Sequence, residues 1–344
     1  MKQHKLKERG PLLNDKGELN EKGYSTFLIK TYNRNDIKAC GFRIKEWDYY
    51  LIYNNKHGIA ITVDDNSYMS LNSVTLFDYE HQTETTQTFI YPFTFGSVRL
   101  PFTSKVGDVK VKARNYSIEI LNDGTERIMN VFIRNFKDGK DLKVNLTLYK
   151  APEDSMVIAT PFHGDAKAFY YNQKIIGFNI KGNVYLGNER IDFDNENTRG
   201  LLDWGRGVWT YHNTWYWGAG AGKVGDKEIG FNIGYGFGDT SNASENMLFV
   251  NGKAHKLDQV KFNIPVKNGK EMFMDKWTFS SNDGRFEMEF VPVLDRNSYT
   301  SVGVISSDQH QVFGKFTGKM ILDNGEVVEI KEFMGFAEKV VNYW

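Results

Sequence analysis

The stretch RIMNVFIRNFKDGKDLKVNLTLY, residues 127–149, shows the pattern that decides the fold. Apolar and polar side chains alternate on both sides of the central turn Lys137-Asp138-Gly139. Alternation with a period of two residues is typical of a strand with one buried face, and a short turn containing Asp-Gly joins antiparallel strands. The stretch therefore predicts a β-hairpin.

The same pattern recurs from about residue 25 to the end of the sequence. Four further turn signals separate alternating runs, at residues 55–58, 122–124, 282–284 and 323–325. We expect on the order of twenty strands and no amphipathic helix longer than two turns. Because a twisted open sheet rarely exceeds about ten strands, the sequence predicts an all-β fold of two closed or nearly closed antiparallel barrels.

The alternation of apolar and polar residues is interrupted between Pro152 and Pro161, where two prolines stand among small residues. We expect the domain boundary there, with an N-terminal barrel over residues 1–165 and a C-terminal barrel over residues 166–344.

Composition excludes several classes of protein. The chain of 344 residues has 43 basic and 43 acidic side chains, so its net charge of zero gives no sign of a nucleic-acid or anionic-membrane partner. The single cysteine, Cys40, excludes an intramolecular disulfide framework. No apolar run matches a secretory signal or an integral membrane segment, so we expect a cytoplasmic protein. The oligomeric state stays open.

One aromatic segment, LLDWGRGVWTYHNTWYWG at residues 201–218, holds four of the seven tryptophans. If it forms one strand, the rings of Trp209, Tyr211, Trp215 and Trp217 share one face, and Arg206 and His212 lie on the other. Rings that line a concave surface suit flat or amphiphilic small molecules. The alternative is core packing, with Asp203 and Arg206 paired as a structural lock.

Acid–base candidates stand in and around this segment. The catalytic candidates are Asp203, Arg206, His212, Glu245 and His310. Glu245 and His310 can titrate near neutrality when partly buried, and Asp308 shares a strand face with His310. Residues 220–225 match GxGxxG but lead into another strand, so we interpret them as a hairpin turn. No metal-ligand spacing is present, and we expect neither a metal nor a cofactor.

Long stretches resemble the family called domain of unknown function 2804. They are FYYNQK (169–174), DWGRGVW and WYWGAGAG (within 203–222), GFNIGYGFGDTSNASENM (230–247), SNDGRFEMEFVPVLDR (281–296) and DQHQVFGKFTG (308–318). Thr210 and Ser244 depart from the family's usual Pro and Thr. The ligand-binding candidates within these stretches are Trp204, Trp209, Tyr211, Trp215, Trp217, Tyr171, Arg285 and Gln311.

A more distant resemblance is to the hydroxyneurosporene-synthase-like group. It implies two tandem lipocalin-like (calycin) barrels, and enzymes of hydratase or cyclase type that act on apolar substrates near the barrel junction. We therefore expect an apolar or amphiphilic small-molecule ligand and, as one hypothesis, a cofactor-independent hydratase, lyase, isomerase or cyclase. The alternatives are a non-catalytic carrier of a lipid-like ligand and a carbohydrate-active protein in which Asp203 and Glu245 act as the two carboxylates.

Overall fold

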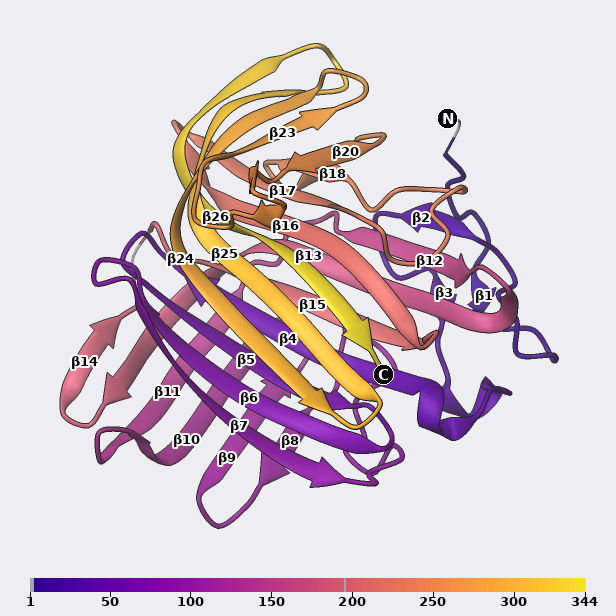
Figure 1. Cartoon of the computed structure of the whole chain (residues 1–344), viewed down its shortest axis with the longest axis horizontal. Helices are drawn as coiled ribbons and strands as arrows, with labels where there is room; N and C mark the ends of the chain where they lie inside the picture. The colour runs from indigo at the N-terminus through magenta and orange to yellow at the C-terminus, as the bar shows by residue number, and fades with distance from the viewer. Residues whose placement is uncertain (1–2, 195) are drawn as a thin grey trace.

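A computed structural model describes residues 3–194 and 196–344, which form 26 strands and two 3-10 helices, η1 (Arg34–Asp36) and η2 (Gly41–Arg43) (Figure 1). Apart from a two-residue parallel pair between β1 (Gly10–Pro11) and β3 (Lys30–Thr31), the paired strands are antiparallel. The predicted all-β fold of two tandem antiparallel barrels is confirmed. Within the described residues, no helix is long and apolar enough to cross a bilayer.

The first sheet has thirteen strands and forms the lower half of the molecule in Figure 1. Its main path is β7-β6-β5-β4-β15-β13-β11-β10-β9-β8, with β12 and β14 paired to β13 and β2 paired to β12. The strands are β2 (Gly23–Ser25), β4 (Ile44–Tyr53), β5 (His57–Asp65), β6 (Met69–Asp78), β7 (Thr83–Pro92), β8 (Val109–Lys112), β9 (Tyr116–Asn122), β10 (Arg127–Lys137), β11 (Lys140–Tyr149), β12 (Met156–Phe162), β13 (Asp165–Leu186), β14 (Glu189–Asp192) and β15 (Arg199–Val208).

The second sheet has nine strands in the order β19-β18-β17-β16-β26-β25-β24-β23-β20. They are β16 (His212–Val224), β17 (Lys227–Tyr235), β18 (Met247–Val250), β19 (Lys253–Lys256), β20 (Val260–Asn263), β23 (Trp277–Ser281), β24 (Phe286–Val302), β25 (Ile305–Ile321) and β26 (Val327–Tyr343). A small separate hairpin joins β21 (Val266–Lys267) to β22 (Lys270–Glu271). In Figure 1 the long strands β24 to β26 curve down across the first sheet.

The chain changes sheets between Val208 and His212. Residue 165, where the sequence indicated the domain boundary, is instead the first residue of β13, which lies inside the first sheet. Pro152 precedes the short strand β12 and Pro161 lies near its end, just before the turn into β13, so the prolines interrupt the alternating pattern without ending the sheet.

The predicted turns fall between consecutive antiparallel strands. The signals at 55–58, 122–124, 137–139, 282–284 and 323–325 lie at the β4–β5, β9–β10, β10–β11, β23–β24 and β25–β26 connections. The three glycines of residues 220–225 have different positions. Gly220 and Gly222 lie within β16, whereas Gly225 (φ 62°) makes the turn into β17. The hairpin interpretation therefore holds for the last of them.

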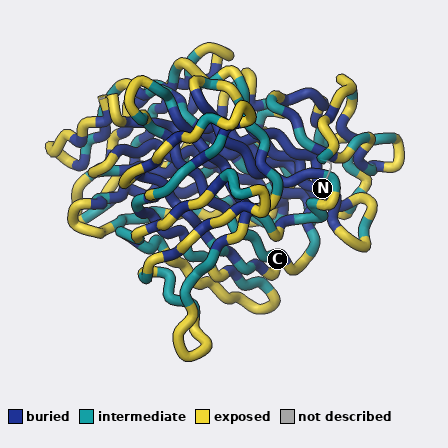
Figure 2. The backbone as a smooth tube through the Cα atoms, turned by 90° about the horizontal axis from the view of Figure 1, so that it is seen from above, coloured by how far each residue is buried: buried dark blue, intermediate teal, exposed yellow. Residues whose placement is uncertain are grey.

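Apolar side chains form three cores. One fills the concave side of the first sheet and includes Ile52 and Trp204, and another fills the second sheet and includes Phe290. The third lies between the two sheets and includes Leu51 and Phe336. Strand β4 shows why two cores meet there, because successive side chains alternate between the first core and the layer between the sheets. Figure 2 shows the resulting continuous buried backbone across the middle of the molecule.

Gly205 lets an aromatic ring lie flat against β15 in the layer between the sheets. It is directly opposite Trp47 in β4, and the indole of Trp47 stacks on Tyr170 with ring centroids 5.9 Å apart. A Cβ at residue 205 would lie 1.9 Å from Cζ2 of Trp47. The glycine thus supplies space for the ring, and the pairing of β15 with β4 runs through it without a bulge.

We expect Gly205→Ala to lower the free energy of unfolding by about 1–3 kcal/mol, because the Trp47 ring must move out of a packed layer. Gly41→Ala is the control, since the nearest atom to its new Cβ would be Phe95 Cδ1 at 4.0 Å. Urea unfolding of both variants measures the difference. Equal losses in the two variants would contradict this account.

Candidate functional site

A buried ion pair lies on the face of the first sheet that meets the second. Lys174 in β13 is directly opposite Asp203 in β15, and Lys174 Nζ lies 2.9 Å from Asp203 Oδ2. Asn172 Nδ2 donates to the other carboxylate oxygen of Asp203 at 2.5 Å. Both charged side chains are nearly inaccessible to solvent. The carboxylate therefore has a bonded partner on each oxygen, as a buried charge requires.

The second sheet presents its own carboxyl group to the same layer. Glu338 in β26 is directly opposite Trp217 in β16 and Gln311 in β25. Its Oε1 accepts a hydrogen bond from Trp215 Nε1 at 2.9 Å, and its Oε2 accepts one from Gln311 Nε2 at 3.0 Å. Gln311 Nε2 also lies 3.2 Å from the hydroxyl of Tyr49 in β4. Gln311 therefore ties Glu338 to the first sheet.

A third carboxyl group, Glu245, comes from the loop before β18. Asn232 in β17 holds it, because Asn232 Nδ2 donates to the Glu245 backbone carbonyl at 2.9 Å and to Glu245 Oε2 at 3.4 Å. The amide oxygen of Asn232 accepts from Trp217 Nε1 at 2.8 Å. One asparagine thus fixes both an aromatic ring and a carboxyl group.

Lys174, Asp203, Glu245 and Glu338 together form what we call the inter-sheet quartet. Lys174 Nζ lies 3.7 Å from the ring centroid of Trp217, so the ammonium group also makes a cation–π contact. Burial raises the pKa of Glu338 to about 7, and the charge of Asp203 adds to the rise while Lys174 opposes it. Burial likewise raises the pKa of Glu245. Within the quartet, one ammonium group thus faces three carboxyl groups in a layer that disfavours charge, and the charge of Lys256 also opposes the rise at Glu245.

Aromatic rings cover one side of the quartet. Phe237 lies at their centre, with ring centroids 4.7 Å from Tyr170, 4.7 Å from Trp209 and 5.3 Å from Trp215. Beyond it, Phe162 packs edge-on against Phe237 at 5.1 Å.

Phe162 also lines a surface pocket of about 410 Å³, together with Leu19, His163, Asp165 and Asp239 among others. This volume lies within the range of small-molecule sites. One layer of aromatic rings thus separates the pocket from the quartet.

Three buried polar atoms beside this wall have no hydrogen-bond partner among the described residues. They are Asn172 Oδ1, next to Asp203, and the indole nitrogens of Trp209 and Trp344. The rings of Trp209 and Trp344 lie 6.0 Å apart. Unpaired buried polar atoms cost free energy, so these positions suit the polar end of an amphiphilic molecule.

The structure brings six of the residues selected from the sequence to this layer: Asp203, Glu245, Trp209, Trp215, Trp217 and Gln311. The interpretation of residues 201–218 as one strand is wrong, because β15 ends at Val208 and β16 begins at His212 in the other sheet. The face assignment built on that strand fails with it.

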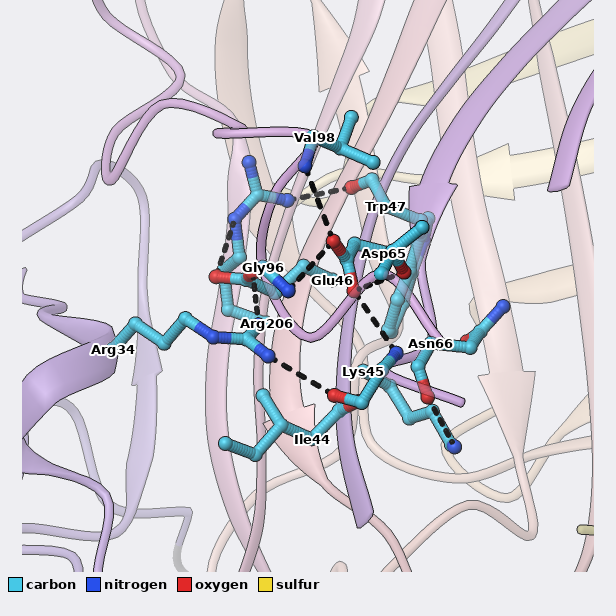
Figure 3. A network of polar contacts seen from close by, with 12 residues as sticks. Arg34, Ile44, Lys45, Glu46, Trp47, Asp65, Asn66, Gly96, Val98 and Arg206 are labelled. Atoms are coloured by element: carbon cyan, nitrogen blue, oxygen red, sulfur yellow. Dashed lines mark hydrogen bonds and ion pairs between the residues drawn. The ribbon is translucent and has the colours of Figure 1, made fainter. Parts of the chain in front are cut away.

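Arg206 is three residues from Asp203 on β15, so its side chain lies on the other face of the strand, among polar groups of the first sheet (Figure 3). Its Nη2 donates to Asp48 Oδ1 at 2.9 Å and to the carbonyl of Pro101 at 2.9 Å, and its Nη1 donates to the carbonyl of Trp47 at 2.7 Å. Its guanidinium also lies 4.4 Å above the Trp204 ring. Arg206 is therefore bonded as a cross-link between loops and strands of the first barrel.

In the part of the chain that the structure describes, the other selected residues also make no hydrogen bond or ion pair with the quartet. Trp204 and Tyr171 are fully buried in the first barrel. Tyr211 and His212 are exposed at the sheet change, where the His212 ring stacks on Tyr343 at 4.3 Å.

Two more of them belong to the second sheet. His310 Nδ1 lies 2.7 Å from Asp295 Oδ2, and the His310 ring stacks on Phe273. Burial lowers the pKa of His310, but Asp295 and Asp308 raise it by more, so the pKa lies above its ordinary value. Arg285 links Asp323 to the carbonyls of Ile321 and Lys256.

Sequence reasoning missed Lys174 and Glu338, the two groups that complete the quartet. Lys174 is the one charged residue in FYYNQKII, and Glu338 stands beside Lys339 in FMGFAEKVV. The signal that could have revealed Lys174 and Glu338 was a charged residue in a run whose side chains are apolar on both faces of the strand. Within the described residues, no group of three or more His, Cys, Asp or Glu side chains is arranged to hold a metal ion.

Comparison with known proteins identifies the family and the fold. The chain belongs to the family described as Domain of unknown function (DUF2804), which matches residues 3–344. It is similar to the crystal structure of a protein assigned as AttH from Nitrosomonas europaea, with a TM-score of 0.55 and 14% identity over 91% of this chain and 98% of that chain. This likeness shows a shared fold. No protein with a curated description matches the chain.

Two further solved structures match more weakly. Kievitone hydratase from Nectria haematococca has a TM-score of 0.47 and 10% identity, over 92% of this chain and 96% of that chain. CghA with Sch210972 has a TM-score of 0.45 and 10% identity, over 96% of this chain and 97% of that chain.

The raised pKa of Glu338 predicts a pH dependence of stability. Folded Glu338 retains a proton up to about pH 7, whereas the unfolded side chain releases it near pH 4.5. The free energy of unfolding should therefore fall as the pH rises through this window, by at most about 3 kcal/mol from this group. Urea unfolding at several pH values measures the slope. In Glu338→Gln the slope should be smaller, and an unchanged slope would contradict the assignment.

Arg206 and His212 should differ sharply in their effect on stability. Arg206→Met leaves Asp48 buried without its partner, so we expect a loss of about 3–5 kcal/mol. His212→Ala removes only an exposed ring, and its effect should stay within about 0.5 kcal/mol. Urea unfolding of both variants tests this. A neutral Arg206→Met would show that the guanidinium is not the cross-link described.

Proposed function

We propose that this member of the DUF2804 family binds an apolar or amphiphilic small molecule between its two sheets and transforms it by proton transfer, as a cofactor-independent hydratase, other lyase, isomerase or cyclase. The observation that carries the proposal is the inter-sheet quartet beside a wall of tryptophans. General acids and bases act best when their pKa lies near the working pH, and Glu338 has a pKa of about 7.

The carboxyl groups of the quartet have different surroundings, which assigns them different tasks. Glu338 is hydrogen-bonded to neutral donors and is the proton donor. Asp203 is paired with Lys174 and is the proton acceptor. In a hydration, Glu338 would protonate one carbon of a double bond while Asp203 takes a proton from the water that adds to the other carbon. Two carboxyl groups in different surroundings can divide acid and base chemistry between them in one site.

The aromatic wall determines which molecules fit. Indole rings offer large apolar faces with one polar edge, so an apolar body would pack on Trp209 and Trp215 while its polar end reaches Asn172 Oδ1. The surface pocket beside Phe162 is the entry in this proposal. Rotation of Phe162 and Phe237 would open the way to the quartet. Arg206, His212 and His310 have no part in the proposed reaction.

A search for the substrate tests the proposal directly. The wild-type protein is incubated with a small-molecule extract of the cells it comes from, and mass spectrometry follows both molecules retained by the native protein and molecules converted. We expect Glu338→Gln and Asp203→Asn to slow conversion by a factor of about 100 or more while still retaining the ligand. Phe237→Ala tests the route of entry and should change the rate of ligand uptake.

His310→Gln is the matched control, because this partly buried histidine is bonded to Asp295 and lies outside the quartet. It should convert substrate as the wild type does. If a ligand is retained and no product forms with the wild-type protein, the protein is a carrier and the catalytic proposal is wrong. If Glu338→Gln and His310→Gln lose equal activity, the quartet is not the reacting site.

A further inference from the structure

One stretch of the surface is unusually rich in apolar side chains. Between residues 90 and 106, the exposed ones are Ile90, Tyr91, Phe93, Phe95, Phe102 and Val106. Phe42, in η2, is 52% exposed and packs edge-on against Phe95 with ring centroids 4.9 Å apart. We call these seven residues the aromatic patch. Exposed apolar side chains gathered in one segment of the chain favour an interaction site.

The backbone of the patch is held in a conformation that bulky residues rarely adopt. Phe93, Phe95 and Arg99 have φ values of 57°, 45° and 59°, in the left-handed region. The Phe93 amide donates to the carbonyl of Tyr68 at 2.7 Å, and the Phe95 amide donates to the carbonyl of Ser67 at 2.9 Å. Strain of this kind persists where the surroundings enforce it, and it is concentrated at functional sites.

A buried carboxylate enforces this conformation (Figure 3). Asp65 is fully buried, and its Oδ2 accepts hydrogen bonds from the amides of Gly96 at 2.8 Å and Val98 at 3.4 Å. Its Oδ1 accepts from the hydroxyl of Thr94 at 2.9 Å and from the amide of Ser67 at 2.9 Å. The rings are therefore presented to solvent by a rigid, internally bonded loop.

The segment that carries most of the patch is rich in basic side chains although the whole chain is neutral. Residues 85–114 contain five basic side chains and one acidic one, Asp108. Arg99, Lys105, Lys112 and Arg114 are exposed. Lys110 is paired with Asp108 at 3.0 Å. The excess of positive charge lies in the same stretch as the rings.

We propose that the aromatic patch docks onto the surface of an anionic lipid bilayer. Aromatic side chains favour the interface between headgroups and acyl chains, and basic residues are attracted to the negative potential of an anionic leaflet. Arg99 and Lys105 are exposed in the same segment as the rings, so an anionic lipid surface offers an apolar layer to the rings and opposite charge to the basic side chains.

The patch adjoins the surface pocket. Arg43 follows Phe42 directly, and its Nη1 lies 2.6 Å from Asp165 Oδ2, which belongs to the rim of the pocket. Arg43 Nε also donates to the carbonyl of Trp209 at 2.9 Å. Docking would therefore place the pocket mouth beside the bilayer. Delivery of a lipid-soluble substrate by this route rests on the proposed function, whereas the docking itself does not.

Vesicle co-sedimentation of the full chain tests the docking. The vesicles contain phosphatidylcholine with phosphatidylglycerol, or phosphatidylcholine alone. We expect binding to the anionic vesicles that weakens with added salt. Phe93→Asn with Phe95→Asn should reduce the partition coefficient at least about tenfold, because two interfacial rings are lost. Asparagine tolerates the left-handed conformation, so the loop should keep its shape. Arg99→Gln with Lys105→Gln should reduce binding to anionic vesicles only.

The control is Val302→Ser with Val304→Ser, since these side chains are 70% and 77% exposed at the tip of the β24–β25 hairpin. This variant should bind as the wild type does, and circular dichroism should show that all the variants are folded. Absence of wild-type binding to anionic vesicles would overturn the proposal. An equal loss in the control would also overturn it. So would a result in which sedimentation velocity shows that the wild-type protein self-associates, and the Phe93/Phe95 variant abolishes this self-association but still binds vesicles.

Discussion

The ion pair of Lys174 and Asp203 constrains how the two sheets can meet. Charges removed from water are stabilised only when their remaining atoms find partners, and these partners come from both sides of the layer. Asn172 bonds Asp203 within the first sheet, while Trp217 of the second sheet covers the ammonium group of Lys174. A shift of one sheet against the other would leave Lys174 paired with Asp203, because both lie in the first sheet, but it would move the Trp217 ring away from the ammonium group. That contact and the hydrogen bond between Gln311 and Tyr49 thus favour one alignment of two surfaces that apolar contacts alone would allow to slide.

The β-fold was predictable because its signals are local. A turn such as 137–139 and the alternation beside it act over a few residues, and they hold whatever packs on them. The change of sheets was not predictable in the same way. It occurs over residues 209–211, and the run from 208 to 217 has neither Gly nor Pro to mark a turn. Arg206 and His212 were therefore placed on one strand, although they belong to different sheets.

The candidate site was predictable only in part. Asp203 and Glu245 stood out because they lie beside tryptophan or in a polar loop of rare composition. Lys174 and Glu338 did not, because a single charged residue in an alternating strand usually faces solvent. Here the outer face of each sheet is covered by the other sheet, and no pattern within one strand reports that. The same limit applies to the exposed patch: a neutral total charge concealed the basic stretch at 85–114.

The place of β26 in the second sheet determines when the site can exist during synthesis. This strand pairs with β16 on one side and β25 on the other, so it joins two groups of strands that are otherwise separate. It also carries Glu338. While the ribosome is still translating residue 320, the first sheet can be complete, but β16 has no partner on that side. The quartet therefore cannot be complete until β26 has been synthesised, and the part of the first sheet that this strand covers stays uncovered until then.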